Sequence, residues 1–165
     1  MLASKPPPEP TPEPPGGRFD GPVHWFPVRV YFEDTDLSGV VYHANYLRWF
    51  ERARSDMLRL LGIDQRAAHE TGEGAYAVSE LAIRYRAPAR LDDVVTVRTR
   101  TLEVGAASCR IAQAIWRGET LLADGEVRAA FVAPDGRARR QPPEWRAAFL
   151  KLHDSRPSHG NLKST

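Results

Sequence analysis

The chain has 165 residues, 42% of them hydrophobic and 27% charged, and its formal net charge at pH 7 is +2. These values are typical of a globular domain in water, and so small a net charge gives no reason to expect a nucleic-acid partner. Without its proline-rich start the chain keeps about 145 residues, which is enough for one domain with a buried core.

Several kinds of site have no support in the sequence. The single cysteine, Cys109, excludes an intramolecular disulfide, and its place among alternating apolar residues predicts a buried structural thiol. The five histidines are scattered without a second ligand at usable spacing, so we expect no metal. Neither a nucleotide-binding glycine loop nor a Gly-x-Ser-x-Gly elbow is present. The lack of a signal peptide and of a long apolar run predicts a cytoplasmic protein without membrane insertion.

Residues 1–21 form a low-complexity segment that is rich in proline and almost free of apolar side chains. Since such a segment has little to bury, we expect a disordered, extended tail. Its Pro-x-x-Pro spacing is compatible with docking into an aromatic groove, but a solvated tail without a partner is the simpler interpretation. We predict a folded domain over residues 22–152 and a flexible C-terminal tail over residues 153–165.

The folded domain begins with an apolar pattern over residues 24–33, which predicts a strand whose Pro27 suits an edge or a strand start. After a loop, residues 44–61 have the spacing of an amphipathic helix, and Gly62 predicts its end. The apolar side of this helix comprises Tyr46, Trp49, Phe50, Ala53, Met57, Leu60 and Leu61. The polar side comprises Arg48, Glu51, Arg52, Ser55, Asp56 and Arg59.

A short second helix is predicted over residues 64–70, and four strand-like segments follow it. They cover residues 75–86, 93–104, 107–117 and 121–132. A terminal helix is predicted over residues 143–152. One strand, a long helix and a run of long antiparallel strands predict an α+β domain, in which the helix packs on a curved antiparallel sheet of about five strands.

The loop before the long helix is the part of the chain with the clearest chemistry. It contains Asp34 and Asp36, then Gly39, and His43 stands just before the helix. A helix N-terminus offers free N–H groups and a partial positive charge to a developing oxyanion. A carboxylate beside it can act as a base or as a nucleophile. The loop therefore predicts a hydrolytic site.

The same stretch resembles a known family. Residues 34–36 (DTD), 39–46 (GVVYHANY) and 50–54 (FERAR) resemble the signature of hotdog-fold acyl-CoA thioesterases, specifically the YbgC-type group related to 4-hydroxybenzoyl-CoA thioesterase. Residues 85–93 (YRAPARLDD) are similar to a second family segment, Y-x-x-P-A-x-x-x-D. The resemblance covers residues 24–150. It implies the hotdog fold, in which the curved sheet wraps the long central helix.

The resemblance also implies roles for individual residues. Asp36 corresponds to the catalytic carboxylate, as nucleophile or general base, and the backbone N–H of His43 polarises the thioester carbonyl. The loop and helix start would contact substrate through Gly39, Val41, Tyr42, Asn45 and Tyr46. Arginines near the nucleotide end of coenzyme A would be Arg84, Arg86 and Arg90.

Plainer interpretations stand beside these roles. Asp36 could simply cap a turn, and His43 could be a polar residue at a helix start. The three arginines could be solvated charges on a strand edge. Asp34 is interpreted as a structural residue of the loop. Glu51 is expected to form an ion pair or a subunit contact, and it is the second candidate for the carboxylate.

The implied activity is hydrolysis of an acyl-CoA to free acid and coenzyme A, without a metal or organic cofactor. The alternative is a non-catalytic hotdog module that binds an acyl thioester or acyl-carrier protein; a hotdog dehydratase matches the motif less well. The family usually forms dimers by joining sheet edges, so we expect a homodimer or homotetramer. A link to the Tol-Pal system is a guess about biological context.

Overall fold

The structure is a computed structural model that describes residue 10 and residues 12–154. The predictions for residues 1–9, 11 and 155–165 therefore lie outside the described part of the chain. The helices are α1 (His43–Leu60), α2 (Gln65–Glu70) and α3 (Pro143–Asp154), with a 3-10 turn, η1 (Phe32–Asp34). The strands are β1 (Arg18–Asp20), β2 (Val23–Arg29), β3 (Ala75–Tyr85), β4 (Val94–Val104), β5 (Ser108–Arg117) and β6 (Thr120–Val132).

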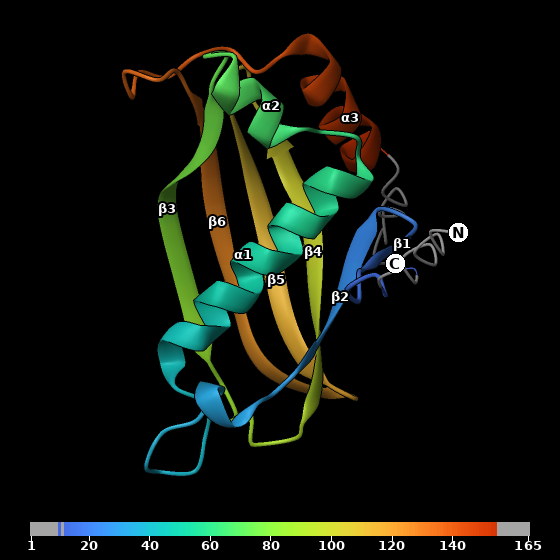
Figure 1. The fold of residues 1–165 in the computed structure, drawn as a ribbon, viewed down its shortest axis with the longest axis vertical. Helices are drawn as coiled ribbons and strands as arrows, with labels where there is room; N and C mark the ends of the chain where they lie inside the picture. The colour runs from blue at the N-terminus through green and yellow to red at the C-terminus, as the bar shows by residue number, and fades with distance from the viewer. Residues whose placement is uncertain (1–9, 11, 155–165) are drawn as a thin grey trace, which may run out of the picture.

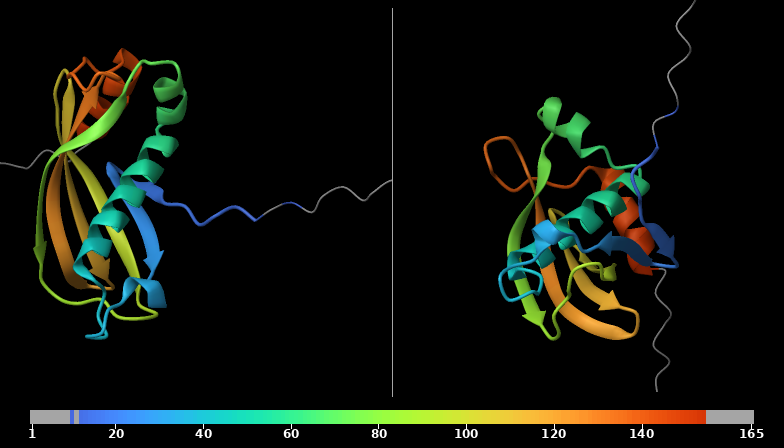
Figure 2. Two further views of the ribbon diagram at one scale, coloured as in Figure 1. Left: turned by 60° about the vertical axis from the view of Figure 1, so that its left-hand side comes forward. Right: turned by 60° about the horizontal axis from the view of Figure 1, so that its bottom comes forward.

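The described strands form one antiparallel sheet in the order β1-β2-β4-β5-β6-β3. The sheet curves around α1, which crosses its concave face (Figures 1 and 2). This arrangement confirms the predicted α+β layout of a long helix wrapped by a curved antiparallel sheet. The sheet has one strand more than expected because Arg18–Asp20, which we assigned to the N-terminal tail, pair with β2.

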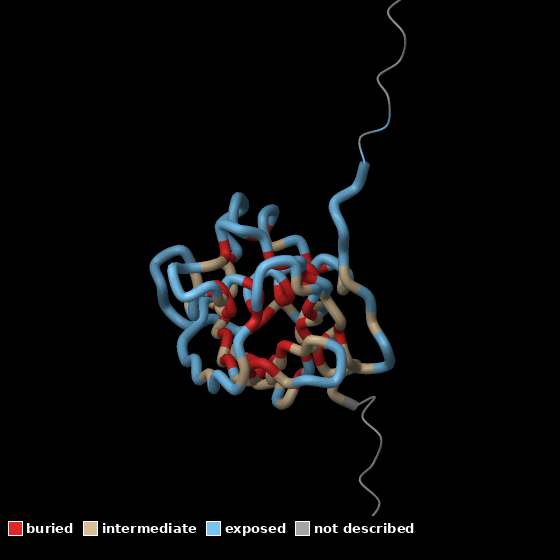
Figure 3. Tube along the Cα trace, turned by 90° about the horizontal axis from the view of Figure 1, so that it is seen from below, coloured by how far each residue is buried: buried red, intermediate tan, exposed pale blue. Residues whose placement is uncertain are grey.

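Alternation of side chains explains how the sheet and the helix share a core. Along β4, Val95, Val97 and Thr99 are buried beneath α1, and the residues between them point to the other face. Residues on one side of α1, among them Trp49 and Phe50, fill the concave face. Buried positions accordingly gather between the helix and the sheet in Figure 3. Within the described residues, no helix combines the length and the apolar character that a membrane crossing requires.

The predicted faces of α1 are wrong at two positions. Leu60, assigned to the apolar face, is 47% exposed, and Asp56, assigned to the polar face, is only 4% exposed. The Asp56 carboxylate is buried because three donors satisfy it: the Gly17 N–H at 2.9 Å, the His24 ring Nε2 at 2.8 Å, and the Arg59 guanidinium. This carboxylate therefore ties the first two strands to the middle of the helix.

The segment before β1 and the ring of His24 lie close against Asp56. His24 is fully buried, and among the described residues its Nδ1 atom has no hydrogen-bond partner. Burial lowers the pKa of His24 below its ordinary value, although its contact with Asp56 acts in the opposite direction. Gly17 leaves no room for a side chain, since an added Cβ would lie 2.5 Å from the Trp25 carbonyl oxygen.

The buried, neutral His24 predicts a loss of stability in mild acid. Because its pKa is lower in the folded than in the unfolded chain, the unfolded chain binds more protons below about pH 6.5. The free energy of unfolding should therefore fall between pH 7.5 and 5.5, by up to about 1.4 kcal/mol per pH unit for this group. Urea unfolding at the two pH values measures this change.

A His24→Gln variant is the matched comparison because glutamine can still donate to Asp56 but does not titrate. The free energy of unfolding of this variant should change less between the two pH values than that of the unchanged protein, whatever its absolute stability. An equal pH dependence in both proteins would contradict the assignment.

Candidate active site

The loop between η1 and α1 is a tight turn that begins at Asp36. Thr35 and Val41 pair as an isolated bridge, and the Asp36 N–H donates to the Val40 carbonyl at 3.0 Å. Within the turn the Gly39 N–H donates back to the Asp36 carbonyl at 3.0 Å. Gly39 has φ +78°, a left-handed backbone that a residue with a side chain adopts only with strain. This backbone conformation accounts for a glycine at position 39.

The Asp36 carboxylate is exposed on this turn and is held in one orientation by Ser38. It accepts the Ser38 hydroxyl and, at 2.8 Å, the Ser38 N–H. These two bonds, with a smaller contribution from the charge of nearby His43, lower the pKa of Asp36 below its ordinary value. The side chain is therefore an anion at neutral pH, as a nucleophile or a general base requires.

The turn delivers the chain to the N-terminus of α1. Tyr42 is the N-cap residue, its N–H donates to the Asp34 carbonyl at 2.9 Å, and no side chain of the described chain caps the helix. The first N–H groups, beginning at His43, therefore remain available to an oxygen atom of a bound molecule. Tyr85 on β3 touches this turn of the helix, since its hydroxyl donates to the His43 carbonyl at 2.9 Å.

Asp34 anchors the loop through buried hydrogen bonds. Its carboxylate accepts the Tyr31 N–H at 2.8 Å, and its carbonyl accepts the Asn45 side-chain amide at 2.9 Å. These contacts agree with the structural role that the sequence predicts for Asp34. The Asn45 side chain is itself buried, so its contact fixes the first helical turn against the loop.

A second loop, residues 86–93, closes the same end of the molecule (Figure 1). The Val41 N–H donates to the Ala89 carbonyl at 2.9 Å, and the Ala89 N–H donates to the buried Tyr46 hydroxyl at 2.9 Å. Asp93 holds the loop from its other side, accepting the Arg90 N–H at 2.8 Å and the Arg117 guanidinium at 2.7 Å. The Asp36 turn, the helix start and the 86–93 loop are thus one hydrogen-bonded unit.

The predicted site residues fall into two groups. Those gathered at this end of the molecule are Asp36, Gly39, Val41, Tyr42, His43, Asn45, Tyr46 and Arg90. Arg84 and Arg86 lie on β3 and just after it; Arg86 pairs with Asp124, and Arg84 borders a hollow on the sheet face away from α1. The contact of these arginines with phosphate remains a prediction. Glu51 forms the expected ion pair, with Arg54.

Sequence reasoning missed Tyr85. Its ring lies 6.2 Å from the ring of His43 and 5.3 Å from that of Tyr46, measured between centroids. The only available signal was its place at the start of the 85–93 segment, which gives no distance to the helix. Among the described residues, no three His, Cys, Asp or Glu side chains gather as a metal site requires.

Comparison with known proteins identifies the family of this chain. Residues 30–151 match the model of the Thioesterase-like superfamily. The chain belongs to this superfamily. It is 46% identical to the acyl-CoA thioesterase YbgC of Haemophilus influenzae over 107 aligned residues. This alignment covers 65% of this chain and 79% of the relative. It is 43% identical over 110 residues to the acyl-CoA thioester hydrolase YbgC of Escherichia coli O6:H1, covering 66% and 81%.

Solved structures of the superfamily share the fold. A probable thioesterase from Bartonella henselae superimposes with a TM-score of 0.70 at 37% identity, covering 73% of this chain and 99% of that one. The membership and the wrapped-helix fold that the sequence predicts are therefore both confirmed. The part of the chain outside the family-model match includes β1 and all of β2.

The hydrogen bond from the Ala89 N–H to the Tyr46 hydroxyl, here called the clamp, joins α1 to the 86–93 loop. Removing the hydroxyl should therefore lower the stability of the fold. In a Tyr46→Phe variant the Ala89 N–H, which lies in the core, loses its acceptor. An unsatisfied buried donor costs about 1–3 kcal/mol, measured as the decrease in the free energy of urea unfolding. Tyr42→Phe is the control, because that ring is exposed and should change stability by less than about 0.5 kcal/mol. Equal losses in the two variants would contradict the clamp.

Proposed function

We propose that this protein hydrolyses acyl-CoA thioesters, with Asp36 as the reacting carboxylate and the N–H of His43 as a donor to the thioester carbonyl. The observation that carries the proposal is an ionised carboxylate beside an uncapped helix N-terminus, in a chain of the Thioesterase-like superfamily. Donors fixed before the reaction stabilise negative charge on the carbonyl oxygen as it develops. The relatives named above, which carry acyl-CoA thioester hydrolase activity in their names, support the choice of substrate.

Two routes fit this arrangement, and both consume only the thioester and water. In the first, an Asp36 oxygen attacks the carbonyl carbon, the carbon–sulfur bond breaks, coenzyme A leaves as the thiolate, and water hydrolyses the resulting anhydride. In the second, Asp36 removes a proton from a water molecule that attacks the same carbon. Neither route calls for a metal or an organic cofactor. In a single turnover in ¹⁸O-water, label enters Asp36 only by the first route, and only when water attacks the Asp36 carboxyl carbon of the anhydride; attack at the acyl carbon labels the product acid, as the second route does.

A second copy of the chain would complete the site. Asp36 lies on an exposed turn, and within the described residues it is absent from the linings of the cavity beneath α1 and of the outer hollow. β3 ends the sheet order, so in the described part of the chain one side of its backbone has no neighbouring strand, and Val78, Leu81 and Tyr85 on it are exposed. An exposed edge with apolar side chains favours pairing with another strand. We propose a homodimer in which β3 pairs with β3 of a second copy. Assembly into a tetramer and a link to acyl-carrier protein or the Tol-Pal system remain predictions.

The charges on β3 favour one register for this proposed pairing. Glu80 and Arg84 stand four residues apart on the strand face away from α1, where Glu80 meets Arg128 of β6 and Arg84 borders the outer hollow. In an antiparallel twofold pair centred on Ala82, each Glu80 faces Arg84 of the partner subunit. Opposite charges directly across a strand pair are stabilising, whereas like charges are destabilising.

Asp36→Asn should retain the fold and lose the activity. Asparagine keeps the size and the turn contact but is neither a base nor a nucleophile, so kcat for release of free thiol from acyl-CoA should fall at least about 100-fold. The measurement is a thiol-release assay over a panel of short, long and aromatic acyl-CoA thioesters.

Asp135→Asn is the matched control. Asp135 also lies on an exposed turn and accepts the N–H two residues ahead, from Arg137 at 3.0 Å, but it is remote in sequence from the loop. Its replacement should leave turnover unchanged. An Asp36→Asn protein with full turnover would exclude the proposed role, and tight acyl-CoA binding without thiol release would favour a binding module.

Arg84→Glu should weaken the proposed dimer. The change places two glutamates opposite each other at both ends of the pairing, and we expect the dimer dissociation constant to rise roughly tenfold. The double variant Glu80→Arg/Arg84→Glu restores opposite charges and should recover the original constant. Sedimentation equilibrium measures both.

Arg137→Glu makes the same charge change on a turn away from β3 and should leave the dissociation constant unchanged. If the double variant dissociates as readily as Arg84→Glu, the register is wrong. If the unchanged protein is a monomer, the edge pairing itself is wrong.

A further inference from the structure

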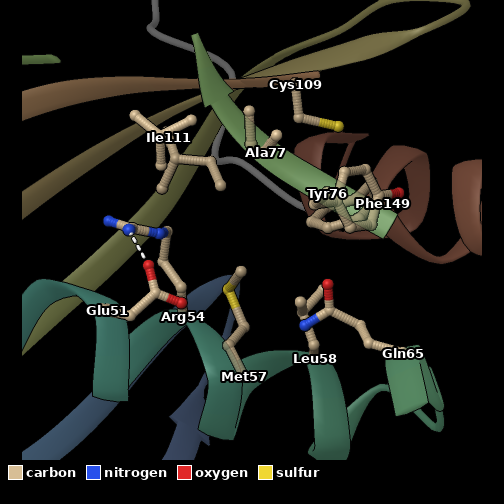
Figure 4. Close-up of a pocket in the computed structure, with 12 residues that line it drawn as sticks. Glu51, Arg54, Met57, Leu58, Gln65, Tyr76, Ala77, Cys109, Ile111 and Phe149 are labelled. Atoms are coloured by element: carbon tan, nitrogen blue, oxygen red, sulfur yellow. Dashed lines mark hydrogen bonds and ion pairs between the residues drawn. The ribbon is translucent and has the colours of Figure 1, made fainter. Parts of the chain in front are cut away.

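Two spaces on opposite faces of the sheet differ greatly in size. The cavity beneath the C-terminal half of α1, drawn in Figure 4, has a volume of about 50 Å³, which suits a few water molecules rather than an organic ligand. The outer hollow, on the sheet face away from α1, has a volume of about 610 Å³. This value lies within the range of ligand pockets, about 300–1,000 Å³, so the outer hollow is the better candidate for a binding site.

The outer hollow forms because β5 carries small side chains in the middle of this face. Each of two alanines on β5 pairs with an arginine of β4 on one side and with an acidic residue of β6 on the other. These rows are Arg98–Ala114–Asp124 and Arg100–Ala112–Glu126. Neighbouring strands lie about 4.8 Å apart, so the long side chains of β4 and β6 form two walls about 10 Å apart above a floor of alanine.

Arg98 in the β4 wall is held by two tryptophan rings that also line the hollow. Its guanidinium carbon lies 4.2 Å from the ring centroid of Trp25 and 4.6 Å from that of Trp116. The rings come from β2 and β5, the strands on either side of β4. Such cation–π contacts orient the guanidinium without neutralising its charge. The Nε atom of Arg98 is buried and has no hydrogen-bond partner within the described residues.

The two walls differ in charge balance. The carboxylates of the β6 wall are already paired, with Arg86 and Arg110, neither of which lines the hollow. In the described part of the chain, Arg98 and Arg100 of the β4 wall form no ion pair. Because arginine keeps its charge at any ordinary pH, the β4 wall attracts an anion.

The spacing of the two arginines matches a phosphate group. Side chains two residues apart on one strand start about 6.6 Å apart and point to the same face, so both guanidinium groups can reach one anion. A phosphate monoester carries a charge of about −1.5 to −2 at pH 7 and three acceptor oxygens, so it neutralises both cations. A carboxylate would neutralise only one of them.

We propose that the outer hollow binds a phosphate monoester. The phosphate lies between the guanidinium groups of Arg98 and Arg100, and the organic part lies over Ala112 and Ala114. Nucleotides and phosphorylated sugars or glycerol share this chemistry. The ligand is a molecule separate from the thioester that reacts at Asp36.

The position of the hollow separates this ligand from the proposed reaction. The Val30 N–H donates to the Asp93 carbonyl, at the end of the sheet that carries the Asp36 turn. Arg100 pairs with Val23, seven residues before Val30, which is about 23 Å of extended chain. The hollow also opens on the sheet face away from α1. The inference therefore goes beyond the proposed function and does not depend on it.

Calorimetry with Arg100→Gln tests the phosphate contact. The probes are adenosine monophosphate, glycerol 3-phosphate and inorganic phosphate, each titrated into the unchanged protein and the variants. Arg100 is exposed, so its replacement is compatible with the fold, and the affinity for both esters should fall at least tenfold. Arg18→Gln is the control, because Arg18 also lies over the Trp25 ring but outside the hollow. It should leave both affinities within twofold.

Ala112→Leu tests the floor without removing a charge. The leucine fills space that the organic part would occupy, so the affinity for both esters should again fall at least tenfold. Ala130→Leu makes the same change on β6, outside the hollow, and should leave the affinities within twofold. Equal affinities in the two variants would count against the alanine floor as part of the site.

The probes also identify the source of the phosphate. Tighter binding of adenosine monophosphate than of glycerol 3-phosphate assigns a nucleotide, and the reverse order assigns a phosphorylated sugar or glycerol. Inorganic phosphate that binds as tightly as both esters would overturn the assignment to an ester. The site itself is wrong if the unchanged protein binds none of the probes, or if Arg100→Gln binds them as tightly as the unchanged protein.

Kinetics separates this ligand from the substrate, since coenzyme A itself carries a 3′-phosphate monoester. In Arg100→Gln the KM for acyl-CoA should stay within twofold of its normal value. A rise as large as the loss of affinity for adenosine monophosphate would place the substrate's own phosphate in the hollow and overturn a separate site. If the unchanged protein releases no thiol from any acyl-CoA, the proposed function fails, and calorimetry still decides the phosphate site.

Discussion

The arrangement of the site depends on how the first turn of α1 is fixed. Two loops that are far apart in sequence converge on it: the Asp34 carbonyl accepts from Tyr42 and Asn45, and Ala89 is bonded both to Val41 and to Tyr46. These hydrogen bonds hold one geometry because any alternative would leave buried groups such as the Ala89 N–H and the Asn45 side chain unsatisfied. The network fixes the Asp36 turn against the helix start, and the hydrogen bonds from Ser38 keep the Asp36 carboxylate ionised.

The two ends of α1 contribute different features to the structure. Its N-terminus supplies donors for a developing charge, and its middle and C-terminal half cover an apolar cavity with a paired Glu51–Arg54 mouth. In the proposed dimer, antiparallel pairing of β3 places the Tyr85 end of one strand beside the Val78 end of the other, so that the exposed edge becomes an interface.

Much of this organisation is readable from the sequence, and the failures have physical causes. The long helix, the four long strands and the Asp36 turn follow from local periodicity and residue type, which the fold obeys. Local periodicity predicts the wrong face of α1 for Asp56 and for Leu60. For Asp56 the cause is that its burial depends on donors from Gly17 and His24, more than thirty residues away. Strand β1 and the cavity likewise depend on contacts between distant segments, which no local pattern encodes.

A crystal structure of the Asp36→Asn protein with an unreacted octanoyl-CoA tests the central claim most directly. The account predicts the thioester oxygen within hydrogen-bond distance of the His43 N–H and the side chain at position 36 facing the carbonyl carbon. A thioester bound away from the start of α1, or a side chain at position 36 turned away from the carbonyl carbon, would contradict it.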